Sequence, residues 1–346
     1  MISGKIVKEK RILLLTVSVI LAAALTLTLV LCASARKDKD VGDNELESSA
    51  RVSQRRNFLL LGVDRVSGLT DVMMLLSLDS DSGRLDILQI PRDTYAEYAD
   101  LGYRKINGAS KALGADGVCD FLSRALCVDI EGYASIGLDS FAKVVDMIGG
   151  VEIDIPFDME YRDPYQDLYI SIPAGRQTLN GARAEQFVRY RFGYVRGDLG
   201  RIDAQKLFMS AFLRQVREEV GRLELLRIAS ALFDEIDTNI SLTDALSLAT
   251  SVLGIDAERI NMLTLSGEDV RSENSGAWFY VISKSAAQEQ MSRYMGADAD
   301  ESEFDRDGAF LYESSERFAK IYASYLPYSV TNAGELDKNG IEIEKS

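Results

Sequence analysis

Short apolar runs that end in glycine, proline or aspartate alternate with longer amphipathic stretches through most of this 346-residue chain. The runs NFLLLGVD, DVMMLLSLD and LDILQIP, over 57–64, 71–79 and 85–91, predict three consecutive strands. The turn SDSGR separates the second run from the third. Further strands are expected at YASIGL, GGVEIDIP, INMLTL and AWFYVI.

Helical patterns lie between these strands. Helices are expected over 115–127 and 140–148. A further helix is expected to end near Val188, and several helices follow from Asp198 to about Leu253. Several of the strands are almost continuously apolar, which is typical of a sheet covered on both faces. The pattern therefore predicts an α/β fold, a three-layer α/β/α sandwich with a mixed central sheet.

The N-terminus predicts a membrane anchor. Residues 12–35 carry no charge and are long enough to cross a bilayer, and four basic residues precede them. Cleavage of a signal peptide after ASA, or lipid attachment at Cys32, are the alternatives. We expect a cytoplasmic N-terminus over 1–11, one transmembrane helix over 12–35 and a polar linker over 36–56. The remainder would lie outside the cell membrane, with a catalytic domain over 57–283 and an acidic segment of uncertain order over 284–346.

The composition limits which side chains can carry the function. The formal net charge of −15 argues against nucleic-acid binding, and the absence of histidine removes an imidazole base and histidine-bound zinc. Cys119 and Cys127 would be too far apart on one helix to form a disulfide, so both are expected to be core-facing thiols. Carboxylates, arginines, lysines, amides or a hard metal ion must therefore carry the function.

Charged residues follow the predicted strands. Asp64 follows the first, Asp71 opens the second, and Arg92 with Asp93 follows the third. An antiparallel hairpin would bring Asp64 near Asp71, and two close carboxylates favour a hard cation such as Mg²⁺. Ordinary turn aspartates are the alternative.

The stretch FVRYRFGYVRGDLGRIDAQKLF holds the densest basic cluster. If the helix ends near Val188, Arg189 and Arg191 lie on an extended segment and point the same way. Asp198 can cap the next helix, whose Arg201 and Gln205 share a face. Such a cluster can bind a multiply charged oxyanion, although a solvated basic face is the alternative.

In order, the motifs GVD, TDVMML, IPRDT, KINGA, VDMIGGVEIDIP, GRQTLNG, RYR, GDLGR and Gln205 closely resemble the LytR-CpsA-Psr family over about residues 57–283. The resemblance implies a phosphotransferase on the outer face of the bacterial membrane. Such an enzyme moves an anionic glycopolymer from a polyprenyl (undecaprenyl) pyrophosphate carrier to peptidoglycan. A non-catalytic polyprenyl-pyrophosphate binder or envelope regulator is the alternative function.

The resemblance also implies roles for individual residues. Asp64 and Asp71 would hold Mg²⁺ (or Mn²⁺) against the pyrophosphate. The groups expected to bind the pyrophosphate are Arg92, Lys105, Arg189, Arg191, Arg201 and Gln205, and those expected at the chemical step are Arg92, Asp93, Asp198 and Arg201.

The sequence departs from the family pattern at two positions. Leu69 and Ala204 stand where the family often has arginine, so the site is less cationic than usual. Arg92 and Arg201 are both expected at element ends, where replacement by alanine should leave the fold intact.

Overall fold

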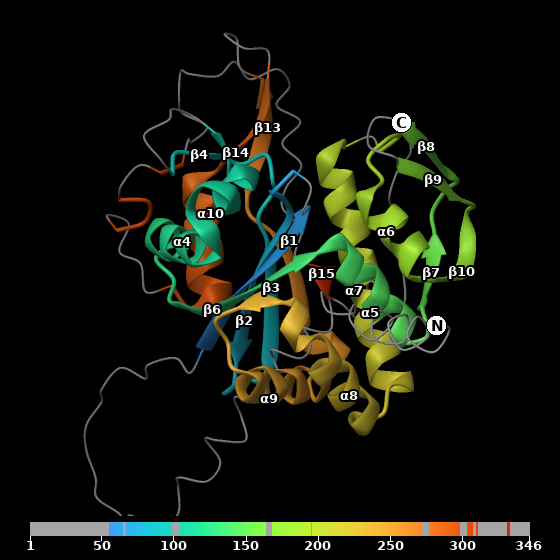
Figure 1. Ribbon diagram of the computed structural model, residues 1–346. Coiled ribbons are helices and arrows are strands. Elements are labelled where there is room, and N and C mark those ends of the chain that lie inside the picture. Colours follow the sequence, from blue (N-terminus) through green and yellow to red (C-terminus); the bar gives the residue numbers. More distant parts are fainter. Residues whose placement is uncertain are drawn as a thin grey trace, which may run out of the picture.

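The computed structural model describes residues 55–64, 67–98, 104–163, 168–194, 196–271, 277–297, 303–306, 309–310 and 331–332. A seven-stranded sheet in the order β11–β6–β1–β2–β3–β12–β15 lies at its centre (Figure 1). Its strands are β1 (Arg55–Asp64), β2 (Leu69–Asp79), β3 (Arg84–Gln89), β6 (Ile130–Gly137), β11 (Asp237–Thr238), β12 (Ile260–Thr264) and β15 (Thr331–Asn332).

The sheet is mixed. Strand β2 pairs antiparallel with both β1 and β3, whereas β1 pairs parallel with β6 and β3 pairs parallel with β12. The tight β1–β2 and β2–β3 connections allow the antiparallel pairs, and the parallel pairs require longer crossovers that contain helices. The mixed α/β fold expected from the sequence is confirmed.

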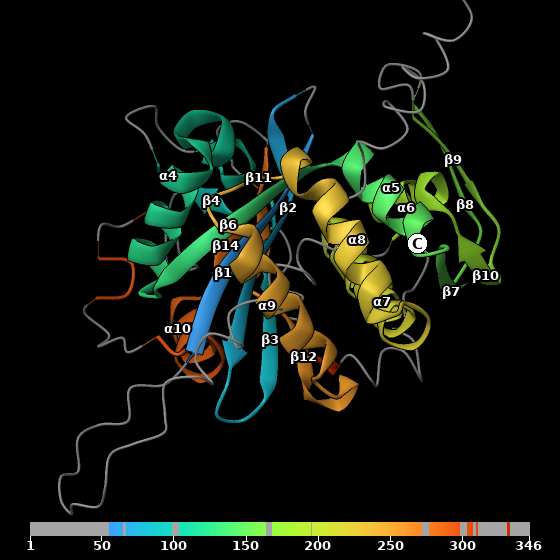
Figure 2. The same ribbon diagram turned by 60° about the horizontal axis from the view of Figure 1, so that its bottom comes forward.

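Both faces of the sheet are covered by helices (Figures 1 and 2). In β1, Phe58 and Leu60 face one apolar core, while the alternate residues Leu59 and Leu61 face a second core. This alternation explains the continuously apolar sequence. The first core includes residues of α5 (Leu138–Met147), α6 (Gly181–Arg189), α7 (Asp198–Glu219), α8 (Arg222–Leu232) and α9 (Leu242–Leu253). The second includes residues of α4 (Ala109–Leu126) and α10 (Lys284–Gln290).

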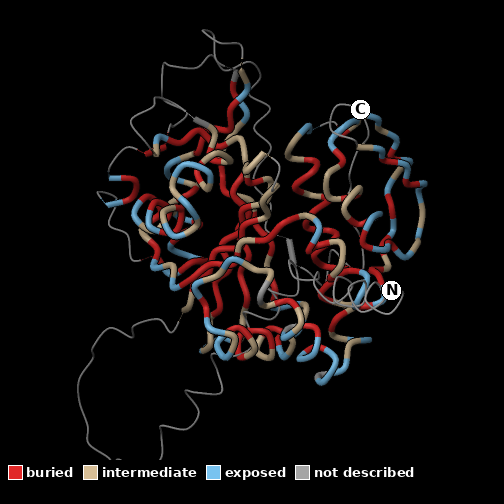
Figure 3. Tube along the Cα trace, in the orientation of Figure 1, coloured by how far each residue is buried: buried red, intermediate tan, exposed pale blue. Residues whose placement is uncertain are grey.

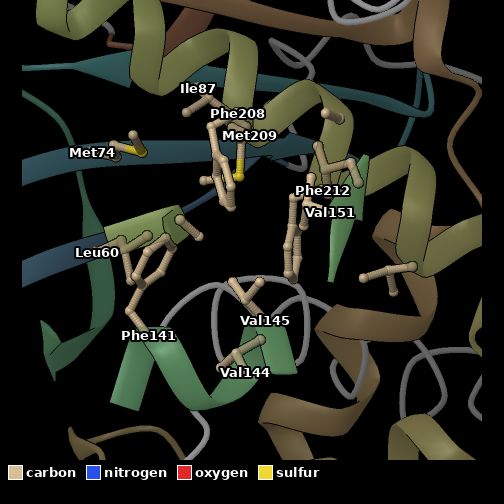
Figure 4. Packing of buried hydrophobic residues seen from close by; sticks show 14 of the residues in the cluster. Leu60, Met74, Ile87, Phe141, Val144, Val145, Val151, Phe208, Met209 and Phe212 are labelled. Carbon is tan, nitrogen blue, oxygen red and sulfur yellow. The ribbon is translucent and has the colours of Figure 1, made fainter. Parts of the chain in front are cut away.

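Helix α7 runs through the first core. Its Phe208 ring lies 5.4 Å from the ring of Phe141 on α5, centroid to centroid (Figure 4). The Phe208 ring also lies 6.2 Å from that of Phe187 on α6. Figure 3 shows that buried residues also dominate the central strands. Because α7 is packed on most sides, the side chains near its N-terminus stand on a rigid support.

Two small antiparallel pairs lie beyond α5 and α6, at the right of Figure 1. Strand β7 (Val151–Ile155) pairs with β10 (Gly175–Leu179), and β8 (Met159–Asp163) pairs with β9 (Leu168–Ile172). Helix α6 begins in close contact with α5. A Cβ at Gly181 would lie 1.8 Å from the Ala142 carbonyl oxygen, so the contact requires glycine there. Asn180 caps α6 by accepting a hydrogen bond from the Arg183 amide.

Helix α4 begins earlier than the sequence pattern predicts, at Ala109 rather than 115. Gly114, inside it, has φ +74° and non-helical geometry, so the apolar period is broken there. Cys119 is buried, and burial together with Asp116 and Asp120 raises the pKa of its thiol to about 12. Cys127 is half-buried, and neither cysteine forms a disulfide. The expected free thiols are confirmed.

The ordered fold continues past the expected domain boundary at 283. Helix α10 follows β14 (Trp278–Ile282) and leads into a π-helical turn, Met291–Met295, that buries both of its methionines in the second core. The expected anchor over 12–35 lies outside the described residues. Within the described ranges, no helix is long and apolar enough to cross a bilayer.

Candidate active site

A cavity of about 300 Å³ opens at the end of the sheet, between the β1–β2 hairpin and the helices α6 and α7. Four arginines and two aspartates line it beside apolar and aromatic residues. The lining is Asp64, Asp71, Val72, Arg92, Leu138, Tyr161, Leu168, Val188, Arg189, Arg191, Phe192, Arg201 and Gln205. On a chain whose net charge is −15, this excess of cations is a local feature of the cavity.

A β-bulge aims Asp71 at the cavity. Val63 pairs with Thr70 and Gly62 pairs with Val72, which leaves Asp71 as the extra residue between them. A bulge re-aims side chains, and this one needs Gly62, whose added Cβ would lie 2.9 Å from the Val72 Cβ. Asp64 ends β1 on the same hairpin and also lines the cavity. The structure therefore brings the two aspartates together, as the hairpin predicted.

Arg92 is held by a turn that follows β3. The Thr94 amide donates to the Pro91 carbonyl at 3.0 Å, and the Asn107 amide donates to the Arg92 carbonyl at 3.1 Å. The Tyr280 amide of β14 donates to the Asp93 carbonyl at 2.8 Å. Because the turn itself and two other segments fix this backbone, Arg92 is presented to the cavity in a defined position.

Carboxylates surround the Arg92 guanidinium. Its Nη1 donates to Asp71 Oδ1 at 2.5 Å, and its Nε lies 3.6 Å from Asp198 Oδ1 and 3.9 Å from Asp93 Oδ1. Burial lowers the pKa of Arg92, but Asp198, Asp71 and Asp93 together raise it above its ordinary value. The arginine thus remains charged and oriented next to the place where an anion would bind.

Arg201 is more deeply buried than the sequence indicates. Its side chain is 4% exposed, and its Nη2 donates to Asp198 Oδ2 at 2.9 Å. Its Nε has no hydrogen-bond acceptor among the described residues. Burial and the neighbouring Arg92 lower the pKa of Arg201, with Asp198 opposing them. Arg201 does lie at an element end, on the first turn of α7, as the sequence predicts. It is buried there, however, so the expectation that its replacement by alanine leaves stability unchanged no longer follows.

Asp198 does not cap α7. Gly197 is the N-cap residue, with φ +55°, and no side chain caps the helix there. Asp198 is the first helical residue, where its charge is favourable beside the positive end of the helix, and its carboxylate binds Arg201. The predicted cap is therefore wrong, and the residue instead orients a cation of the cavity.

Arg189 and Arg191 reach the cavity from the end of α6. The helix ends at Arg189, so Arg189 is still helical and the prediction that it lies on an extended segment is wrong; the extended backbone begins at Tyr190, with ψ 131°. Arg189 also donates to Glu185 at 2.8 Å, one helical turn earlier. Arg191 is exposed and forms no ion pair within the part of the chain that the structure describes. It is available to an arriving anion.

Two glutamines join these segments behind the arginines. Gln205 of α7 donates to the Val188 carbonyl at 3.0 Å and accepts from Gln89 Nε2 at 2.5 Å. Gln89 is 2% exposed at the end of β3. This pair ties the sheet, α6 and α7 together where the cavity forms. We did not predict Gln89, although a polar residue in the apolar strand LDILQIP is a visible signal.

Lys105 and Asp93 do not line the cavity. Lys105, in β5 (Arg104–Lys105), has its Nζ 3.0 Å from Asp93 Oδ1 and 5.8 Å from the centre of the Phe279 ring. The two residues lie behind Arg92 and complete its ion-pair network. Of the two positions that depart from the family pattern, Ala204 is fully buried in the first core, which leaves no room for an arginine without repacking.

A mixed α/β protein with an arginine-lined cavity at one end of its sheet is the class that this fold and site define. The LytR_cpsA_psr family matches residues 25–295, and the chain belongs to that family. It is 28% identical over 217 residues to the polyisoprenyl-teichoic acid–peptidoglycan teichoic acid transferase TagV of Bacillus subtilis, covering 62% of this chain and 56% of that relative. The TagU transferase of Oceanobacillus iheyensis is 28% identical over 236 residues, 66% of this chain and 71% of the relative.

The chain therefore spans little more than half the length of the first of these relatives. Among solved structures, the crystal structure of B. subtilis TagV matches with a TM-score of 0.61 and 24% identity, over 71% of this chain and 99% of that one. At this identity the likeness supports the fold.

Proposed function

We propose that this chain is a membrane-anchored transferase that moves an anionic glycopolymer from polyprenyl pyrophosphate to peptidoglycan. The names of its relatives TagV and TagU support the reaction class. The observation that carries the proposal is the cavity in which four arginines converge from β3, α6 and α7. A guanidinium fork matches phosphate oxygens, and Arg201 Nε has no acceptor among the described residues.

The chain's own residues would bind and orient the pyrophosphate. Arg92 and Arg201 are preset by Asp71 and Asp198, so little ordering remains when the substrate arrives. Arg189 and Arg191 reach the same cavity from α6. Phosphoryl transfer needs in-line positioning and stabilisation of developing negative charge, and cationic side chains supply both.

The proposed step balances as follows. A hydroxyl oxygen of peptidoglycan attacks the sugar-linked phosphorus and forms a phosphodiester, the bond from that phosphorus to the bridging oxygen breaks, and polyprenyl monophosphate leaves. The hydroxyl proton passes to a carboxylate near the cavity, so the absence of histidine is no obstacle.

Asp64 and Asp71 would hold a Mg²⁺ or Mn²⁺ ion. The described residues contain no group of three or more acidic or cysteine side chains that could hold a metal by themselves. Two carboxylates in one cavity fit Mg²⁺, which commonly binds through one or two carboxylates together with substrate phosphates. When bound, the ion would neutralise phosphate charge.

We further propose that residues 12–35 anchor the chain and that the cavity faces the outside of the membrane, where both substrates would lie. The long uncharged run and the basic residues before it support this. A cysteine introduced in 36–56 should react with an impermeant maleimide in intact cells. Reaction only after lysis would contradict the topology.

Transfer can be tested with the purified full-length chain in detergent. A polyprenyl-pyrophosphate glycan with a labelled sugar is mixed with peptidoglycan, and the label in the washed peptidoglycan is measured. We expect the wild type to incorporate the label. Arg92→Ala should incorporate at least about tenfold less, because Arg92 would stabilise negative charge in the transition state, and Arg183→Ala should change incorporation little. Arg183 is the matched control, because it is exposed on α6 and outside the cavity lining. Tight binding without incorporation would instead favour the non-catalytic binder.

A further inference from the structure

The cavity has an exposed aromatic edge that the arginines do not explain. Phe192, in the turn after α6, is 67% exposed although it lines the cavity. Its ring is stacked on that of Tyr161 in β8, with centroids 5.9 Å apart and an interplanar angle of 29°. We call Tyr161 and Phe192 the aromatic pair. A large apolar ring left open beside a binding cavity points to a ligand that covers it.

We propose that the aromatic pair is the subsite for the first sugar of the diphosphate-linked substrate, with one face of the sugar ring lying on Phe192. This inference rests on the proposed function, because it places the sugar next to a pyrophosphate held by the arginines. Arg191 precedes Phe192 directly and lines the same cavity. A sugar joined to the diphosphate would therefore lie within reach of the neighbouring ring.

The apolar residues that line the cavity differ in burial, and this difference indicates where a sugar and where a lipid tail would bind. Val72, Leu168 and Val188 line the cavity and also pack against the first core, so they form its inner side. Phe192 does not pack in that core and remains open to water. An isoprenoid chain gains from full removal from water, which the inner side can offer and a two-thirds exposed ring cannot.

A sugar suits the exposed position. One face of a pyranose carries C–H groups that complement the negative face of an aromatic ring, while its hydroxyl edge stays in water. Tyr161 supports Phe192 from behind, which leaves the opposite face of Phe192 for the ligand. The site combines apolar contact area with a few charged groups, which is typical of ligand-binding sites.

Two probes that differ only in the sugar test this inference. Farnesyl diphosphate and its N-acetylglucosamine ester share the tail and the diphosphate, and calorimetry with the full-length chain measures the affinity of each. We expect Phe192→Ala to weaken the sugar-bearing probe about five- to tenfold and the sugar-free probe less than about twofold, and Phe192→Tyr to restore binding. Trp278→Ala is the control, since Trp278 is 49% exposed on β14 and outside the cavity lining.

The outcomes separate this inference from the proposed function. Equal weakening of both probes, or none in the sugar-bearing probe, would overturn the sugar subsite while leaving the pyrophosphate site intact. If the wild type binds neither probe, the proposed function fails and the inference fails with it.

Discussion

Asp71 combines two roles at a single residue, because it is the extra residue of a β-bulge and the partner of Arg92. Without a cation, its carboxylate is satisfied by the guanidinium at 2.5 Å. An arriving pyrophosphate would compete for Arg92 and add negative charge beside Asp64 and Asp71, which a divalent cation would offset.

We therefore expect Asp71→Asn to lose the Mg²⁺-dependent part of pyrophosphate binding and to keep the part that arises from the arginines. Titration of farnesyl diphosphate by calorimetry, once with Mg²⁺ and once with EDTA, measures both parts. Asp154→Asn, an exposed change on β7, should leave both unchanged. Equal binding by the wild type in Mg²⁺ and in EDTA would show that the two aspartates are only turn residues.

The burial of Arg201 predicts that it serves stability as well as binding. Arg201→Ala should reduce the free energy of unfolding by about 1–2 kcal/mol, because it removes a buried side chain and its hydrogen bond to Asp198, which still has Arg92 at 3.6 Å. Arg191→Ala should weaken anion binding but change stability by less than about 0.5 kcal/mol, since Arg191 is exposed. Urea denaturation of both variants makes the comparison. An Arg201→Ala variant as stable as Arg191→Ala would contradict the ion pair.

At the scale of elements, the β2–β3 turn makes its own contribution to stability. The amides of Asp81 and Ser82 donate to Asp79 Oδ1 at 3.1 Å each, and Arg55 Nη2 lies 3.1 Å from Asp79 Oδ2. Burial raises the pKa of Asp79, but these bonds, the Ser82 hydroxyl and Arg55 outweigh it and lower the pKa below its ordinary value of 3.8.

A folded-state pKa below the unfolded one gives stability that is present above about pH 4 and lost as the pH falls through the folded value. Asp79→Asn should therefore cost about 1 kcal/mol near neutral pH, a figure kept small by solvent screening. The difference from the wild type should shrink as the pH falls below about 4 and vanish once the folded-state carboxylate is protonated. Thermal unfolding from pH 2 to pH 7 tests this, and a difference that grows on acidification would contradict the sign.

The elements also show which parts of the fold can be predicted from the sequence. The first three strands were predictable because they are buried on both faces and therefore read as unbroken apolar runs. Strands β8 and β9 were missed, because they lie in a side layer and carry polar residues such as Glu160 and Ser171 at exposed positions. The kink at Gly114 likewise hid the first turns of α4.

At the scale of the whole molecule, the motifs located most of the cavity but not its internal order. Arg92, Arg189, Arg191 and Arg201 were all predicted and all line it. The burial of Arg201 and the contact of Gln89 with Gln205 depend on how α7 packs against the sheet, whereas the bulge at Asp71 belongs to the β1–β2 hairpin. Packing of this kind joins residues more than one hundred positions apart, and no local pattern reports it.

The central claim is that the cavity supports transfer of a sugar phosphate from a diphosphate-linked lipid to peptidoglycan. The most direct test is ³¹P NMR of a reaction that contains the full-length chain, a polyprenyl-pyrophosphate glycan and peptidoglycan fragments. We predict that the diphosphate signals decline while one phosphodiester and one phosphomonoester signal grow in equal amounts, and that Arg92→Ala shows no change. Persistence of the diphosphate with the wild type, or growth of phosphomonoesters without a phosphodiester, would contradict transfer.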